Sequence, residues 1–375
     1  MTKVLLYSLL LVVGLIASQF LAGTSATAIK LGTMFCLAFI MIHVGYEFEI
    51  DKARPKQYAW DYLVAGPAAA FPWLFCAGYF VWVLGTDSWK DALLLARFSS
   101  PTSAGVLFAM LAAAGLATTW VFKKARVLAI FDDLDTILLM IPLKMLMVGT
   151  KWQLAVIVLV IGALLWLAWR YLHVVRLPVS WPWVMLYAGV ITRVCEAIYL
   201  SSKVIDDTVP VHLEVLLPAF VLGCILARPA GHDPHVDDAR EGHQEGPEEP
   251  DEQRVATIVS ACFMVLVGLS MPVIPRAGIN WGVVAVHVAL ITVLSNIGKM
   301  FPAFCYRQEA TLRERLALSI GMFPRGEVGA GVLVVSLSYG LGGTALTVAV
   351  LSLALNLLLT GVFIAAVKKL IGGRA

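Results

Sequence analysis

The sequence predicts an all-α protein that crosses a membrane about twelve times. Of its 375 residues 60% are hydrophobic and only 14% are charged, a composition too apolar for a soluble domain of this length. Apolar stretches of about 18 to 25 residues, each able to cross a ~30 Å hydrocarbon core, follow one another along the chain. They are predicted at residues 4–22, 28–48, 58–85, 91–118, 125–146, 153–170, 181–200, 210–227, 255–275, 281–304, 315–337 and 343–367.

The distribution of Lys and Arg over the loops predicts the orientation. Basic residues concentrate on the side that holds both termini, as at 52–56, 123–126 and 368–369, and are sparse on the other side. By the positive-inside rule both termini are expected in the cytoplasm, and the chain is expected in a cell (inner) membrane. The first stretch lacks a signal-peptide cleavage pattern and is expected to remain as a helix.

The polar residues outside the apolar stretches indicate neither an enzyme nor a nucleic-acid-binding protein. Residues 229–253 are acidic, rich in Pro and Gly and free of aromatic residues, so they are predicted to form a disordered cytoplasmic linker. The six cysteines are single residues in apolar segments, which favours a packing role over metal binding. The net charge of +3 gives no indication of nucleic-acid binding, and no cofactor is expected.

The two halves of the chain resemble each other. Pro101 follows Gly45 at the same interval at which Pro324 follows Gly268. The two glycines lie on the second and ninth predicted helices, an odd number of crossings apart, so the two copies run through the membrane in opposite directions. This pattern predicts inverted repeats, each with one broken helix, and the two breaks are expected to cross.

Each break lies near the middle of the membrane. Pro101 and Pro324 lie roughly 14 to 16 Å from the nearest surface at 1.5 Å per residue. An interrupted backbone is tolerated at that depth only where it lines a cavity or is covered by protein. The residues expected to line the site there are Ser100, Thr102, Ser103, Pro324, Arg325 and Glu327.

Two adjacent carboxylates and a lysine lie at a similar depth. Asp132, Asp133 and Lys299 are each about 10 to 12 Å from the cytoplasmic face along their helices. Ionisable groups are costly inside a bilayer and usually pair or line an ion path. Carboxylate oxygens suit a small hard cation, and two neighbouring carboxylates do not easily ionise together. Such a site holds either protons or a cation, which is the competition that exchange transport requires.

Four motifs together resemble the cation/proton antiporter superfamily, in particular the electrogenic sodium/proton antiporters of the Asp-Asp type. They are SSPTSAGV at 99–106, FDDLDTIL at 131–138, GKMF at 298–301 and GMFPRGEV at 321–328. The resemblance implies that Asp133 is the essential ion-binding carboxylate, that Asp132 is its partner, and that Lys299 pairs with Asp132 when no cation is bound. It further implies that Thr102 and Ser103 join the two aspartates as ligands of the transported Na⁺.

The resemblance also implies that the helices form two parts, a moving core and a panel. Helices three to five (58–146) and ten to twelve (280–375) are expected to form a core that moves like an elevator. The remaining helices (1–57, 147–228 and 254–279) are expected to form a linking and dimerising panel, which makes a homodimer in the lipid bilayer the expected assembly.

Some alternatives remain open at this stage. A K⁺/H⁺ antiporter or a Kef-like potassium efflux system has a similar membrane domain, and a non-transporting sensor is a weaker alternative. The sequence does not separate Na⁺ from Li⁺ or K⁺, because selectivity depends on cavity size and ligand flexibility. The third carboxylate of the FDDLDTIL segment, Asp135, does not match the family pattern. Arg325 and Glu327 are the most deeply placed polar pair on the eleventh predicted helix, and a structural salt bridge with Glu196 or Glu214 is expected there.

Overall fold

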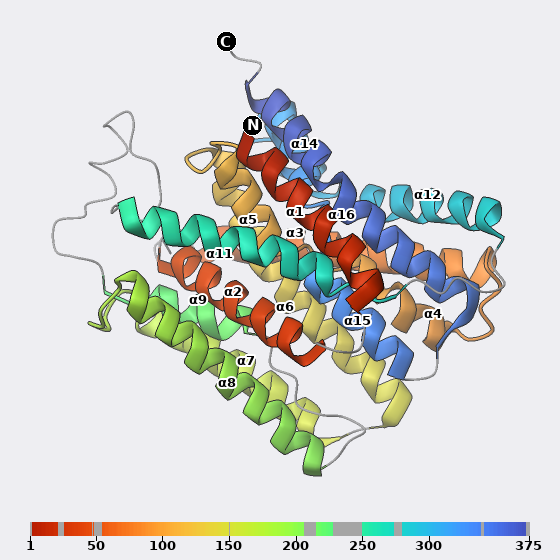
Figure 1. Ribbon diagram of the computed structural model, residues 1–375, viewed down its shortest axis with the longest axis horizontal. Helices are drawn as coiled ribbons and strands as arrows, with labels where there is room; N and C mark the ends of the chain where they lie inside the picture. The colour runs from red at the N-terminus through yellow and green to blue at the C-terminus, as the bar shows by residue number, and fades with distance from the viewer. Residues whose placement is uncertain are drawn as a thin grey trace. The chain divides into compact units, whose positions relative to one another are not determined.

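In the residues it describes, the computed structural model consists of helices and the loops that connect them (Figure 1). These are 2–21, 26–46, 48, 55–149, 151–205, 215–227, 250–273, 280–338 and 341–372. Within them, the only β-type pairing is an isolated parallel bridge between Val175 and Leu226. The predicted all-α fold class is therefore confirmed.

The chain divides into two compact units. Unit 1 comprises Met1–Lys30, Arg54–Met147 and Met264–Ala375, and unit 2 comprises Leu31–Ala53 and Val148–Phe263. The helices of unit 1 are α1 (Thr2–Leu21), α3 (Pro55–Trp82), α4 (Trp89–Ala96), the 3-10 turn η1 (Arg97–Ser99), α5 (Ala104–Ala113), α6 (Trp120–Val148), α12 (Trp281–Gly298), α13 (Pro302–Cys305), α14 (Leu312–Gly321), α15 (Glu327–Ser338) and α16 (Gly343–Gly372). Unit 2 holds most of α2 (Ala26–Tyr46) and α11 (Pro250–Leu269), together with α7 (Trp152–Arg170), α8 (Trp181–Ile205) and α9 (Leu216–Ile225).

Each predicted membrane segment corresponds to one helix or to one broken pair of helices. Among the described residues, nine helical stretches are long and apolar enough to span a membrane. Three predicted segments are not among these nine stretches. They correspond to α6, the short α9 and the α14–α15 pair. In α6 the reason is its charge, since it contains both the basic residues near its start and the three aspartates of the site.

The two helix breaks meet, as predicted. The first interrupts the chain at 100–103, between η1 and α5, and the second at 322–326, between α14 and α15. The Ser103 amide donates to the Pro324 carbonyl at 3.0 Å, and the Thr102 hydroxyl donates to the Met322 carbonyl at 3.1 Å. Each break thus satisfies backbone groups that the other leaves unpaired, which is how an interrupted helix is tolerated in a membrane.

The glycines that mark the internal repeat make equivalent packing contacts. In unit 2, Gly45 of α2 lies against Gly223 of α9, and a Cβ on Gly223 would stand 2.7 Å from the Tyr46 nitrogen. In unit 1, Gly268 of α11 lies against Gly14 of α1, and a Cβ on Gly268 would stand 2.7 Å from the Leu15 nitrogen. In each case the second helix of one half touches the first helix of the other half, as an inverted repeat requires.

The acidic linker falls almost wholly outside the described residues, which resume at Pro250. There α11 begins, with Pro at its first position and Asp251 and Glu252 in its first turn. Pro is favoured at that position and acids are favoured near a helix N-terminus. The last four residues of the predicted linker (250–253) are therefore helical.

Candidate ion-binding site

Asp132 and Lys299 form a buried ion pair. The Lys299 ammonium lies 2.7 Å from both carboxylate oxygens of Asp132, and both side chains are 0% exposed. Asp132 comes from the middle of α6, and Lys299 is the C-cap of α12. The sequence predicted these two residues as partners, and they are far apart in the chain but in direct contact in the structure.

The first helix break supplies a further donor to Asp132. The Thr102 amide donates to Asp132 Oδ2 at 2.8 Å. This amide follows Pro101 in the broken segment, where the helical ladder is interrupted. The carboxylate is thus held by an ammonium and by the break together, which compensates for its removal from water.

Asp133 lies next to this pair on α6. Its side chain is 3% exposed, and it interacts electrostatically with the Lys299 ammonium. One helical residue turns the side chain by about 100° relative to Asp132. The site thus has two carboxylates with different surroundings, one bound to Lys299 and the break, the other beside them.

Arg325 stabilises the second break. Its guanidinium is fully buried and donates to the carbonyls of Met322 (3.1 Å), Phe323 (2.8 Å) and Ser295 (3.4 Å). These carbonyls lie at and just beyond the end of α14 and near the end of α12, where backbone dipoles leave partial negative charge. Its described hydrogen-bond partners are therefore carbonyls, and the expected pairing with a carboxylate stays a prediction. The side chain of Glu327 and all of Glu214 lie outside the described part of the structure.

The hydroxyl groups of the first break have different environments. Ser100 Oγ donates to the Ala69 carbonyl of α3 at 2.9 Å and lies 3.5 Å from Thr136 Oγ1 of α6. The Thr102 hydroxyl bridges to the second break, and Ser103 is buried against Gly326, where a Cβ would stand 2.7 Å from Ser103 Oγ. Ser100 thus anchors the break to α3 and α6, whereas Thr102 and Ser103 lie where the two breaks cross.

Asp135 lies on the side of α6 that packs against α3. Its side chain is 6% exposed, interacts with the Tyr62 hydroxyl, and has Oδ2 3.7 Å from the position of a Cβ on Gly66. The Asp135 carboxylate also interacts electrostatically with Asp132 and Lys299. The third carboxylate that the sequence left without a role therefore belongs to the electrostatic surroundings of the ion pair.

A second buried charge cluster was not predicted from the sequence. Lys124 Nζ of α6 lies 3.0 Å from Asp61 Oδ1 of α3 and 3.0 Å from Glu309 Oε2. The Tyr306 hydroxyl donates to the same Asp61 oxygen at 2.8 Å. Asp61, an isolated acid in an apolar stretch, was the available signal. The cluster joins the segments that follow Lys299 and precede Asp132, so it holds both sides of the site at a second point.

The candidate cation donors are oxygens of more than one kind. Among the described residues, no three or more His, Cys, Asp or Glu side chains gather as a metal cluster. A transported monovalent cation does not require such a cluster, because hydroxyl and carbonyl oxygens also serve as hard ligands. Asp133, the Thr102 and Ser103 hydroxyls and the carbonyls of the breaks provide donors of this kind.

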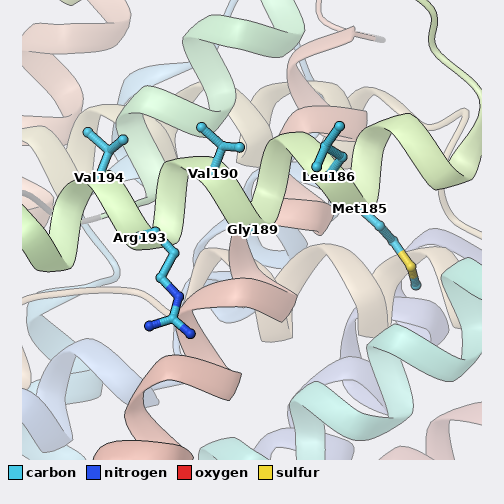
Figure 2. A pocket seen from close by; sticks show the side chains of 6 residues that line it. All are labelled: Met185, Leu186, Gly189, Val190, Arg193 and Val194. Carbon is cyan, nitrogen blue, oxygen red and sulfur yellow. The ribbon is translucent and has the colours of Figure 1, made fainter.

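A shallow groove of about 410 Å³ runs along α8 in unit 2 (Figure 2). Its walls are apolar side chains and one arginine: Met185, Leu186, Gly189, Val190, Arg193 and Val194. Leu186, Val190 and Val194 are each about half exposed. The groove shares no residue with the ion pair.

A family model described as sodium/hydrogen exchanger, transmembrane, matches residues 2–370. The chain belongs to the sodium/hydrogen exchanger family. The resemblance to the cation/proton antiporter superfamily is thereby confirmed, and the chain is a multi-pass membrane protein of a transporter family.

The exchanger fold is also found among solved structures. The chain is similar to the sodium proton antiporter MjNhaP1 from Methanocaldococcus jannaschii at pH 8, with a TM-score of 0.60 and 15% identity over 97% of this chain and 91% of that one. A structure from an electron-microscopy map of the same antiporter gives a TM-score of 0.62 and 14% identity over 98% and 92% of the two chains. At this identity the likeness shows the fold alone. Among curated proteins, no sequence match was found.

Proposed function

We propose that this exchanger-family protein moves Na⁺ and protons in opposite directions across the membrane, with more protons than cations per cycle. The observation that carries the proposal is the buried Asp132–Lys299 pair beside Asp133, at a point where one helix break donates to Asp132. Here a buried ammonium pairs with one carboxylate while a second carboxylate lies beside it. A cation that binds to such a group changes the protonation of the others, because their charges interact.

Asp133 is the proposed essential carboxylate. When a cation binds Asp133, it displaces the proton of that carboxyl group. Its charge also repels Lys299, weakens the Asp132–Lys299 pair and favours release of a second proton from the ammonium. When the cation leaves, both protons return and the pair re-forms. Two carboxylates and one ammonium then cycle between a cation-bound and a proton-bound state, and the two states exclude each other.

In the transport cycle, the ion-binding site also has to be exposed to each side of the membrane in turn. We propose an elevator movement in which residues 58–146 and 280–375 carry the site against a panel formed by 1–57, 147–228 and 254–279, in a homodimer. The contacts between the two breaks support a core that moves as one body, since Ser103 and Thr102 hold the second break directly. The loop distribution of Lys and Arg supports cytoplasmic termini in a cell (inner) membrane.

A K⁺/H⁺ antiporter or a Kef-like potassium efflux system is the second candidate. The observation that keeps it open is the donor set, because hydroxyl and carbonyl oxygens also suit K⁺ and their spacing decides between the ions. A channel-like system would conduct K⁺ down its gradient without coupled proton movement, and that difference can be measured.

Purified protein in proteoliposomes tests the proposed function. With an acid lumen and a pH-sensitive dye inside, external Na⁺ should raise the lumenal pH, and the effect of Li⁺ and K⁺ at the same concentration then ranks the cations. If no cation raised the lumenal pH while K⁺ flux was present, the chain would be a channel or uniporter and the proposal would be wrong.

A further inference from the structure

Thr292 of α12 and Asn356 of α16 each have a buried side-chain oxygen without a hydrogen-bond partner. The two side chains are 4% and 0% exposed, and neither Thr292 Oγ1 nor Asn356 Oδ1 bonds to any residue that the structure describes. Buried polar atoms in proteins are nearly always paired, either with protein groups or with ordered water. Two unpaired oxygens in the interior of unit 1 therefore indicate a bound partner.

A contact between α12 and α16 explains why these two oxygens are left over. A helical threonine commonly donates to the carbonyl four residues before it, which for Thr292 is the carbonyl of Val288. That carbonyl instead accepts from Ser352 Oγ of α16 at 3.4 Å. On α16, Asn356 Nδ2 donates to the Ser352 carbonyl at 3.1 Å, so the free end of the amide is its oxygen. An amide oxygen only accepts, whereas the Thr292 hydroxyl can donate or accept.

The two helices run in the same direction. They meet at Val288 and Ser352, and farther along both reach the second break. There the Ser295 carbonyl of α12 accepts from the guanidinium group of the break at 3.4 Å, and the Phe363 ring of α16 lies 5.3 Å from the Phe323 ring. On each helix the contact with the break comes later in the chain than the contact between the helices, so α12 and α16 are parallel.

The parallel direction brings the two unpaired oxygens to the same level. Thr292 follows Val288 by four residues, and Asn356 follows Ser352 by four residues. Residues four apart share a face of a helix and lie about one turn, ~6 Å, apart along it. Thr292 and Asn356 thus both lie one turn beyond the contact between the helices, on the faces that make this contact.

A water molecule fits this position better than a cation does. A water can donate to Asn356 Oδ1 and can donate to or accept from the Thr292 hydroxyl, and buried waters typically make two to four such bonds. Both oxygens are uncharged. The Arg325 guanidinium binds the Ser295 carbonyl less than one turn beyond Thr292, and its positive charge opposes a second positive charge nearby.

We propose that one water molecule, bound between Thr292 and Asn356, is a structural part of this protein. The water joins α12 to α16 two turns before Lys299, which lies at the end of α12. It therefore helps to hold the helix that carries the lysine in register with α16. The site shares no residue with the proposed Na⁺ ligands, and its existence does not depend on transport.

An electron-microscopy map of the full-length protein in nanodiscs, at a resolution that shows ordered water, tests the site directly. With choline in place of Na⁺, we expect one density peak about 2.7–3.2 Å from both Thr292 Oγ1 and Asn356 Oδ1. The same peak is expected with Na⁺ present. A map without this peak, a direct bond between the two side chains, or a peak that appears only with Na⁺ would overturn the proposal.

Variants test whether the two side chains share the water. Thr292→Val and Asn356→Leu should each lower the melting temperature in Na⁺-free buffer by roughly two to four degrees, because each leaves the other oxygen with an incomplete set of bonds. The loss in the double variant should be clearly smaller than the sum of the two single losses.

Thr347→Val is the matched control, because its buried hydroxyl already has a partner, the Gly343 carbonyl at 3.1 Å. Its loss should add to that of Thr292→Val. Losses that also add for Thr292→Val with Asn356→Leu would overturn the proposal, and the wild-type map decides the matter if a variant does not fold. Neither measurement involves transport, so the outcome is independent of the proposed function.

Discussion

At the residue scale, the site depends on charges that are buried but compensated. Lys299 and Asp132 are fully buried and hold each other at 2.7 Å. Breaking such a pair by removing one partner costs about 3–5 kcal/mol, because the other charge remains buried. Under the proposed function, the pair is intact in the cation-free state, and a cation that weakens it must compensate for the lost contact.

Lys299→Gln should lower the thermal stability of the cation-free protein, because Asp132 keeps only the Thr102 amide as a described donor. Adding Asp132→Asn to Lys299→Gln should recover much of the loss, since a neutral pair leaves no uncompensated charge. Melting curves in detergent for the two single variants and the double variant measure this. Strictly additive losses in the double variant would show that the two residues do not interact.

Lys299→Gln should also change the charge movement of the cycle. If the Lys299 proton leaves when a cation binds, the variant should retain weak exchange but lose much of its voltage dependence. Currents on a solid-supported membrane, normalised to protein amount, report this directly. Undiminished electrogenic current in Lys299→Gln would reject a proton-carrying role and leave the lysine as a structural cation.

At the element scale, the two broken helices and the charge cluster around Asp61 position the site. The Thr102 hydroxyl joins the breaks, and Lys124 joins α6 to α3 and to the segment after α13. Of these elements, α6 carries Asp132 and Asp133, and the segment after α13 follows in the chain from the end of α12, where Lys299 lies. A change in either set should alter the site without touching its charges.

Thr102→Val with Ser103→Ala should raise the Na⁺ concentration for half-maximal exchange by roughly three- to tenfold, as one or two oxygen contacts are lost. Expression should fall less, because the Thr102 and Ser103 amides keep their bonds. Ser270→Ala, which removes a hydroxyl that donates to the Val267 carbonyl at the end of α11, is the control. An unchanged Na⁺ dependence in the double variant would mean that the hydroxyls of the first break only support the fold.

Asp61→Asn should destabilise the protein by about 3–5 kcal/mol, since Lys124 and the Tyr306 hydroxyl both bind this carboxylate. Tyr306→Phe, which removes one hydrogen bond to a charged group, should cost about 1.5–3 kcal/mol. The denaturation midpoints of the two single variants and the double variant measure these losses of stability. If both substitutions left the midpoint unchanged, the cluster would not hold α3 to α6.

The sequence predicted the charged residues of the site better than their surroundings. Asp132, Asp133 and Lys299 were found because an ionisable residue in an apolar stretch is conspicuous. The carbonyl partners of Arg325 and the Asp61–Lys124–Tyr306 contacts could not be predicted, because they depend on how helices distant in the chain pack. The proposed water site has no local sequence signal at all, since it depends on how α12 meets α16.

At the scale of the whole molecule, the inverted repeat explains how one chain builds the site. The helix order was predictable because the apolar stretches, the loop charges and the repeated Gly-to-Pro interval all agree. The repeat glycines then make equivalent contacts, Gly45 with Gly223 and Gly268 with Gly14. The family match and the fold of the antiporter MjNhaP1 are consistent with this arrangement.

The most direct test of the central claim is Na⁺-driven proton movement by Asp133→Asn in proteoliposomes, beside wild type and the exposed control Asp87→Asn. We expect wild type and Asp87→Asn to show the same initial rate. We expect Asp133→Asn to show no rate above empty liposomes while eluting as a folded protein on size exclusion, because the site loses the group that alternately binds cation and proton. Substantial Na⁺-driven proton movement by Asp133→Asn would contradict the account.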